Sequence, residues 1–427
     1  MTFPRSIILA LPALVILLPP PCLAAEEPAA EPPLTPAEKE FAALADDYFD
    51  ELKTFWQQLD KINNPQELDA FYAERDPAIG YMPKFVAFER EHAGEDVGLD
   101  AIGEILSYAG RGGGTASAAY AARRKMLARL PTYEDRELAV GAFHSMCSGN
   151  YDPRIVDYLR RTAVSPRACS IVRETARFTL AKKLLSLRDG REVLEQKLAL
   201  LEARADEASV QEAQDNREFF QDYPSGDQLA AGVREAVAIL QDLAASGEKF
   251  RQPVIRTIDP SGRIARIDPE RTKSAPFLSE TAAALLFKEQ HLRPGQPAPE
   301  MDIELVDRRK WSLASHRGRV VVIQFSFTGC GPCEQMYPDL RELDEQFAER
   351  LSILTLLRDA TPDHGREGID SGRFTWNIGC DGLPGRFTKR WAVDSFPTIY
   401  VIDPAGRVAA VNLRGDALKQ KVTDLVP

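Results

Sequence analysis

The residues of this chain best suited to chemistry are two cysteines separated by two other residues. Cys330 and Cys333 lie in the stretch FSFTGCGPCEQMYP, which begins at Phe325 and follows the run VVVIQ. A pair with this spacing can bind a metal ion, form a structural bridge, or exchange electrons by opening and closing a disulfide. The elements on either side of the pair help to decide among these chemistries.

The pair lies where a predicted strand is followed by a predicted helix. β-Branched and aromatic residues predict a strand over Val320–Phe327, and apolar residues at helical spacing predict a helix over Pro332–Arg350. Unpaired N–H groups and the positive end of the helix dipole favour negative charge, so we expect Cys330 to be partly thiolate and to act as a nucleophile. Cys333, one helical turn further on, is placed to resolve a mixed disulfide.

The alternative chemistries have weaker support in the sequence. A zinc site needs further ligands at comparable spacing, and Cys380 alone does not supply them. Haem attachment needs a histidine directly after the second cysteine, where Glu334 stands instead. A peroxidatic cysteine would be preceded at three residues by threonine, and here Phe327 has that place. Redox exchange without a metal or other cofactor is therefore favoured over a purely structural disulfide.

The region after RPGQPAPE alternates between strands and helices, which predicts an α/β sheet covered by helices. Further strands are predicted at Leu351–Leu357, Thr398–Asp403 and Val408–Leu413, and further helices at Pro384–Val393 and Ala417–Leu425. We place this domain at residues 294–427.

The preceding region has a different pattern. TPAE at Thr35 combines a capping residue, a proline and a glutamate in the order typical of a helix start, and similar starts recur. Residues 35–250 are therefore predicted to form an all-α domain, an irregular bundle or HEAT-like stack, and residues 251–293 a hairpin and a linker helix. The fold class is multidomain, with this all-α part before the α/β domain.

The first residues indicate export. Residues 1–25 combine Arg5, an apolar segment and small residues, as in a cleaved signal peptide, and residues 26–34 form a Pro/Ala-rich spacer. We expect a location in the periplasm or cell envelope; an uncleaved N-terminal anchor is the alternative. The net charge of −11 argues against nucleic acid as a partner.

Cys147 and Cys169 are candidates for a structural disulfide or for two buried free thiols.

Residues 294–427 resemble the TlpA/ResA branch of the thioredoxin superfamily, which are exported thiol:disulfide oxidoreductases. The resemblance rests on CGPC after a strand, on WNIGCDGLPGRF, and on SFPTIYVIDPAGRV. It implies that Cys330 is the nucleophile, that Cys333 is the resolving thiol, and that Pro397 is a cis-proline beside them. It also implies a substrate-binding role for the following residues: Gly331, Pro332, Phe396, whose backbone would pair with a bound peptide, and Thr398.

Several positions depart from the family pattern. The tryptophan common before the first cysteine is Gly329, the buried acid of thioredoxin is Gln324, and the glutamate common after the second cysteine is Met336. The usual proton acceptor is thus missing, and Glu334 and Asp359 are the nearest replacements in sequence.

Cys380 is expected at the end of a strand, on the rim where the strand before Cys330 also ends. We interpret Cys380 either as a small buried residue or as a third redox thiol.

The sequence therefore predicts an exported thiol:disulfide oxidoreductase that acts on protein disulfides and is served by an upstream thiol electron donor. The all-α domain would dock a protein partner. One alternative is a helical partner-binding protein with a redox-responsive thioredoxin-like appendage. A thiol peroxidase is the other.

Overall fold

The computed structural model describes most of residues 33–427. It leaves out 60, 63–64, 109–117, 148–151, 205, 207–208, 211–212, 215, 218–222, 248, 260–261 and 394. The predicted signal peptide and most of the spacer lie outside the described residues. Within the part that is described, no helix is both long enough and apolar enough to cross a membrane.

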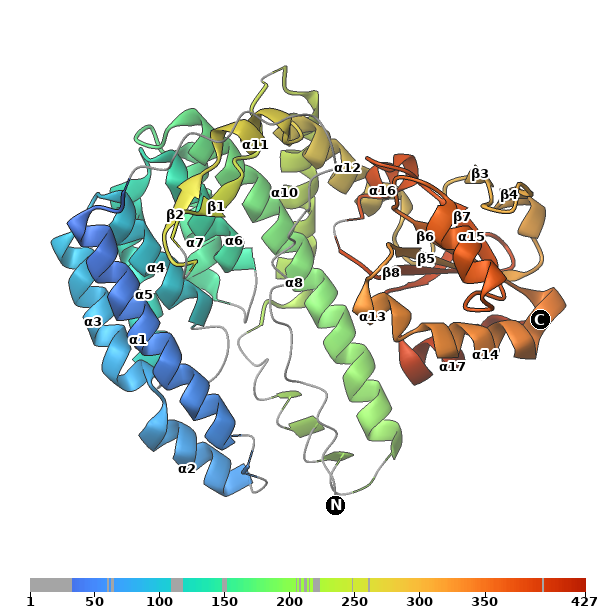
Figure 1. Ribbon diagram of the computed structural model, residues 1–427, viewed down its shortest axis with the longest axis horizontal. Coiled ribbons are helices and arrows are strands. Elements are labelled where there is room, and N and C mark those ends of the chain that lie inside the picture. The colour runs from blue at the N-terminus through green and yellow to red at the C-terminus, as the bar shows by residue number, and fades with distance from the viewer. Residues whose placement is uncertain are drawn as a thin grey trace.

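Helices make up the first part of the chain, drawn blue to green in Figure 1. They are α1 (Pro36–Leu59), α2 (Pro65–Arg75), α3 (Ala78–Glu91), α4 (Asp96–Tyr108), α5 (Ala118–Arg129), α6 (Val140–Cys147), α7 (Pro153–Val164), α8 (Ser170–Arg204) and α10 (Gly226–Ala245). The capping signals in the sequence form as expected. The Thr35 hydroxyl accepts the Glu38 N–H while the Glu38 carboxylate accepts the Thr35 N–H. Ser225 and Gln228 make the same reciprocal pair before α10.

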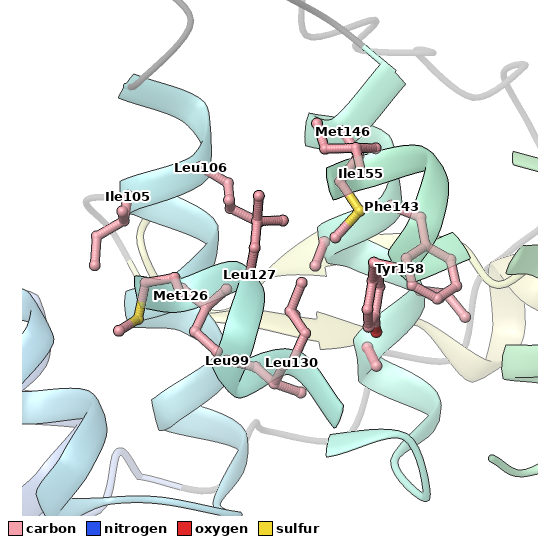
Figure 2. Close-up of a cluster of buried hydrophobic side chains, with 14 of the residues drawn as sticks. Leu99, Ile105, Leu106, Met126, Leu127, Leu130, Phe143, Met146, Ile155 and Tyr158 are labelled. Atoms are coloured by element: carbon pink, nitrogen blue, oxygen red, sulfur yellow. The ribbon is translucent and has the colours of Figure 1, made fainter. Parts of the chain in front are cut away.

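The helices bury one shared hydrophobic core. Along α1 the residues at helical spacing are all buried, among them Phe41, Tyr48 and Phe55. Figure 2 shows how the core continues between α4 and α5 on one side and α6 and α7 on the other, with Leu127 and Tyr158 among its labelled members. The prediction of a helical first part is confirmed, and in α1 the apolar face that predicted the helix is the face that packs.

The predicted hairpin follows the helices. Strands β1 (Ile255–Thr257) and β2 (Ala265–Ile267) pair antiparallel, and α11 (Pro269–Ser274) comes next. The hairpin is tied to the helices by Arg266, whose guanidinium bonds to the carboxylates of Asp100 on α4 and Glu38 on α1.

Helix α12 (Leu278–His291) belongs to both halves of the molecule (Figure 1). Its first turns bury Leu278 and Ala282 in the core of the helical part. At its other end, Leu292 is 2% exposed and lies in a core of the C-terminal domain, with Phe287 packed against the same core.

The C-terminal domain is built on a five-stranded sheet in the order β7-β6-β5-β8-β9. The strands are β5 (Val320–Ser326), β6 (Leu351–Leu357), β7 (Asn377–Cys380), β8 (Thr398–Ile402) and β9 (Val408–Val411), preceded by a small hairpin, β3 (Asp302–Glu304) and β4 (Lys310–Ser312). The helices are α13 (Gly331–Glu334), α14 (Tyr337–Phe347), α15 (Asp363–Asp370), α16 (Arg386–Arg390) and α17 (Gly415–Leu425). β6 is parallel to β5 and β7, while β8 is antiparallel to β5 and β9.

Both faces of the sheet are covered, so its three central strands β6, β5 and β8 are buried along their whole length. Val320 and Val322 of β5 face a core shared with α14 and α17. Val321 and Ile323 face the opposite core, shared with α16 and with Leu292 after α12.

Two predicted helices differ from the structure. The helix expected over Pro332–Arg350 is two helices, α13 and α14, because Pro338 has no N–H to continue the bonding pattern toward Glu334. The helix expected over Pro384–Val393 is only Arg386–Arg390. The Leu383–Pro384 bond before it is cis, and the Asp381 carboxylate accepts the first free N–H groups of α16.

Candidate redox site

Cys330 and Cys333 form a disulfide at the end of the central strand β5. Their Cα atoms are 5.2 Å apart. Cys330 is the N-cap residue of α13 and is 3% exposed, whereas Cys333 lies inside the helix and is 0% exposed. Both residues are buried, so the assignment of Cys330 as the attacking thiol rests on its place at the start of the helix and stays a prediction.

The turn that delivers Cys330 is held by its neighbours. The N–H and hydroxyl of Thr328 both donate to the carboxylate of Asp359, which follows β6. Gly329 has a φ of 83°, a conformation that suits glycine, and a Cβ added there would meet nothing within 4 Å. The position next to Cys330 where the family carries a tryptophan therefore has open space around its Cβ.

The proline expected to face the disulfide has the implied geometry. The Phe396–Pro397 peptide bond is cis, and Pro397 is buried immediately before β8. Arg414 donates to the Pro397 carbonyl at 3.2 Å. The hydroxyl of Thr398 donates to the Ser395 carbonyl at 2.8 Å and the residue is 3% exposed, so its side chain braces this loop.

Two phenylalanines form an aromatic pair at the site. Phe327 is 39% exposed, and its ring meets that of Phe396 edge to face, with 5.4 Å between ring centroids. Gly331 and Pro332 are exposed as well. The surface around the disulfide thus combines open backbone with exposed aromatic carbon.

A chain of hydrogen bonds between buried, uncharged side chains lies behind the disulfide. The Trp376 indole N–H donates to the Thr355 hydroxyl at 2.9 Å, and that hydroxyl donates to the Gln324 amide oxygen at 2.9 Å. The Gln324 amide nitrogen donates to the carbonyl of Cys333 at 3.4 Å.

Neither proposed replacement acid lies in that chain. Glu334 is exposed on the solvent side of α13. Asp359 is committed to Thr328 on the loop before Cys330. Met336 is buried in the sheet core and contributes no proton acceptor.

Cys380 is the last residue of β7, as predicted, and β6 separates its strand from β5. Its thiol is free and half-buried, and it donates to the Asp359 carbonyl at 3.4 Å. Burial, together with the nearby carboxylates of Asp359 and Asp381, raises the pKa of Cys380. At neutral pH this thiol is held in its protonated, unreactive form.

Cys169 is a free, half-buried thiol at the start of α8. It lines a cavity of about 530 Å³ together with Lys249 and Arg251. Of the two alternatives for Cys147 and Cys169, the structure shows the free thiol for Cys169. The side chain of Cys147 lies outside the described residues.

A mixed sheet of this order, with a disulfide after its central strand and a cis-proline on the neighbouring strand, defines a thioredoxin-like domain of the thiol:disulfide oxidoreductase class. Comparison with known proteins agrees with this assignment. Residues 294–411 match the AhpC/TSA family.

Individual relatives fall in the same class. The thioredoxin-like protein YneN of Bacillus subtilis is 26% identical over 131 residues, which cover 30% of this chain and 75% of that protein. The thiol-disulfide oxidoreductase ResA of Bacillus thuringiensis is 25% identical over 138 residues, covering 32% of this chain and 79% of ResA.

Solved structures with similarity to this chain include the thioredoxin domain of a thiol-disulfide oxidoreductase from Bacteroides vulgatus. It is 25% identical with a TM-score of 0.30, and the match covers 32% of this chain and 99% of that one. A thiol-disulfide oxidoreductase from Bacteroides fragilis is 23% identical with a TM-score of 0.29, covering 30% and 99%.

Sequence reasoning missed three features of the site: the contact of the Phe327 ring with Phe396, the roles of Thr355 and Trp376, and the second cis bond before Pro384. The place of Phe327 beside the site could be inferred from the sequence, because Phe327 lies at the end of the predicted strand that precedes Cys330. The roles of Thr355 and Trp376 depend on which strands become neighbours.

Proposed function

We propose that this protein is an exported thiol:disulfide oxidoreductase that reduces or exchanges disulfides in protein substrates. The observation that carries the proposal is the Cys330–Cys333 disulfide at the end of β5, with Cys330 at the start of α13 and cis-Pro397 on the adjacent strand. A disulfide placed only for stability would not need to follow the central strand at a helix start, beside exposed backbone and a cis-proline.

The chemistry balances within this pair and its substrate. In the reduced protein the Cys330 thiolate attacks one sulfur of a substrate disulfide, a mixed disulfide forms, and the other substrate sulfur leaves as a thiol. Cys333 then attacks the Cys330 sulfur, the mixed bond breaks, and the second substrate thiol leaves. Two electrons have passed to the substrate, and an upstream thiol donor must return them.

The backbone around the pair is suited to an extended peptide. Gly331 and Pro332 are exposed and carry no large side chain over Cys330. The peptide groups at Phe396 lie just before the first residue of β8, where a substrate strand can pair in the way a strand adds to a sheet edge. The exposed ring of Phe327 provides an apolar contact next to this path.

Reduction of insulin disulfides by dithiothreitol tests the function directly. The wild-type protein should accelerate the reaction, and Cys330→Ser should abolish the acceleration. Cys380→Ser is the matched control, because it removes a cysteine from the same domain without touching the pair. Equal activity of wild type and Cys330→Ser would contradict the proposal.

The two alternative functions predict different results for the wild-type protein and the Cys330→Ser variant. A thiol peroxidase would consume hydrogen peroxide through Cys330 at a rate well above that of free cysteine, yet Phe327 stands where such a site carries threonine. A helical partner-binding protein with a redox-responsive appendage would bind its partner with an affinity that depends on the state of the disulfide while showing no insulin reductase activity.

We place the helical part as a docking module and the protein in the periplasm or cell envelope. The location is supported by residues 1–25, which resemble a cleaved signal peptide. N-terminal sequencing of the mature protein after expression in a Gram-negative host should give a start near residue 25. A start at Met1 would contradict cleavage and would favour the uncleaved N-terminal anchor.

A further inference from the structure

Gln324 lies at the point where the family resemblance leads one to expect a buried acid. The residue is 0% exposed in β5, directly behind the helix that carries Cys333. Its amide nitrogen donates to the carbonyl of Cys333 at 3.4 Å. The side chain therefore touches the backbone of the resolving cysteine.

The orientation of this amide follows from the donors around it. The Trp376 indole has a hydrogen to give and no acceptor, so Thr355 must accept it. The hydroxyl of Thr355 then gives its own proton to the Gln324 oxygen. This leaves the Gln324 nitrogen facing Cys333, so the chain runs in one direction from Trp376 to the redox pair.

None of the three side chains in this hydrogen-bond chain can take up a proton at physiological pH. Indole, hydroxyl and neutral amide groups do not ionise there. The rest of the domain is consistent with this. Over residues 294–393 and 395–427, the buried polar side chains are Gln324, Ser326, Ser352, Thr355, Thr388 and Thr398, and all are neutral.

We propose that Gln324 is a positioning residue that fixes the Cys333 turn and supplies no proton acceptor, so that Cys333 loses its proton to solvent and not to a buried acid. In the resolving step the Cys333 thiolate forms its bond to the Cys330 sulfur as the bond from Cys330 to the substrate breaks. The substrate sulfur leaves with the electron pair of that bond and takes up a proton from solvent. This inference rests on the proposed function.

The pH profile of the reduced protein tests the inference. We would measure the rate of Cys330 alkylation by iodoacetamide between pH 5 and pH 10 in a Cys333→Ala background, in which the second thiol cannot titrate. With Gln324 in place the rate should follow one ionisation, because no acid lies in the hydrogen-bond chain behind the pair. Gln324→Glu places a carboxyl behind Cys333 whose proton is held by burial, so its profile should show a second transition. A side chain with only a packing role would leave the profile unchanged in shape.

The hydrogen-bond chain is tested separately by Thr355→Val, which removes the donor to Gln324. We expect a severalfold slower insulin reduction with an alkylation profile that keeps one transition, and recovery of the rate in Thr355→Ser. Ser352→Ala is the matched control. Ser352 lies on the same strand and also accepts an indole N–H, from Trp311, but has no contact with the redox pair among its hydrogen bonds.

The outcomes separate this inference from the proposed function. Two transitions in the profile with Gln324 in place would overturn the inference, as would a folded Gln324→Glu protein with an unchanged profile or a Thr355→Val protein with the wild-type rate. Absence of insulin reduction in the wild type would instead overturn the proposed function, while the alkylation profile could still be read.

Discussion

Phe327 and Phe396 stand opposite each other at the mouth of the redox site. In the ladder between β5 and β8, Phe325 pairs with Thr398. Phe327 lies two residues after Phe325 and Phe396 lies two residues before Thr398, so the two phenylalanines are opposite each other. Their rings meet edge to face at 5.4 Å. One ring thus belongs to the strand that leads to Cys330 and the other to the residue before cis-Pro397.

This pairing predicts a preference for substrates with an apolar side chain beside the cysteine. Phe327→Ala removes one ring from the surface that a substrate leucine would cover, and each CH₂ that stays exposed as a result costs about 0.8 kcal/mol, so kcat/KM for a leucine-flanked peptide disulfide should fall roughly fourfold or more. The loss should appear mainly in KM. A serine-flanked peptide should show little change, and Val164→Ala, an exposed apolar residue of α7, is the surface control. Equal losses for both peptides would argue against a specificity role.

Cys330 should be the attacking thiol. It is the N-cap residue of α13, while Cys333 is fully enclosed. In Cys333→Ala the mixed disulfide cannot be resolved, so the protein should accumulate covalent adducts with a disulfide-containing peptide, and mass spectrometry should place the bond on Cys330. Cys330→Ala should give none. Adducts through Cys333 in that second variant would reverse the two roles.

The contacts of α12 predict where the C-terminal domain can be cut. A fragment of residues 294–427 lacks Leu292, which is 2% exposed, and burial of such a side chain contributes about 1.5–3 kcal/mol. A fragment beginning at Leu278 should therefore melt at a higher temperature than one beginning at 294. Leu292→Ala in the longer fragment is the control and should remove much of the difference. Equal melting temperatures for the two fragments would show that the domain begins after α12.

In the full-length protein, ion pairs also hold α12 and the residues after it against α8. Arg188 on α8 binds the Glu289 carboxylate, and Arg293 after α12 binds Asp189 and Glu192 on α8. A boundary read from RPGQPAPE alone misses this arrangement, because proline and glycine mark where the chain turns and carry no information on which core an adjacent helix joins.

The contrast between predicted and missed features follows from the range of the interactions. The strand over Leu351–Leu357 and the end of a strand at Cys380 were correct, because β-branched runs report local burial. The Thr355–Gln324 bond joins residues 31 positions apart and exists only because β6 lies beside β5. The sequence shows that an acid is missing at Gln324, and only the packed sheet shows what replaces it.

Asp100 should make stability fall as pH rises. Burial raises the pKa of Asp100 to about 7, against the attraction of Arg266, which Asp100 shares with Glu38. Below about pH 4 the carboxyl is protonated in the folded and unfolded states alike. Between about pH 4 and pH 7 the unfolded state releases this proton while the folded state keeps it, so folding loses up to about 4 kcal/mol from this group.

The variant Asp100→Asn does not titrate and should become more stable relative to wild type as pH increases. Melting temperatures of the two proteins from pH 4.5 to pH 8 measure the difference. Asp157→Asn is the control, because this carboxylate on α7 is 67% exposed and is not among the groups that shift the pKa of Asp100. A difference between Asp100→Asn and wild type that stays constant with pH would contradict the prediction.

Cys380 should remain outside the redox cycle. Its thiol donates to the Asp359 carbonyl, its pKa is raised by burial and by two nearby carboxylates, and its strand is separated from that of Cys330 by β6. Each of these disfavours the thiolate that would have to attack the Cys330–Cys333 bond. We therefore expect brief alkylation of the reduced protein to label Cys330 and spare Cys380. Non-reducing peptide mapping of Cys333→Ala after mild oxidation gives the decisive reading. A Cys330–Cys380 linkage there would make Cys380 a third redox thiol, while an unlinked Cys380 would leave it a packing residue at the sheet edge.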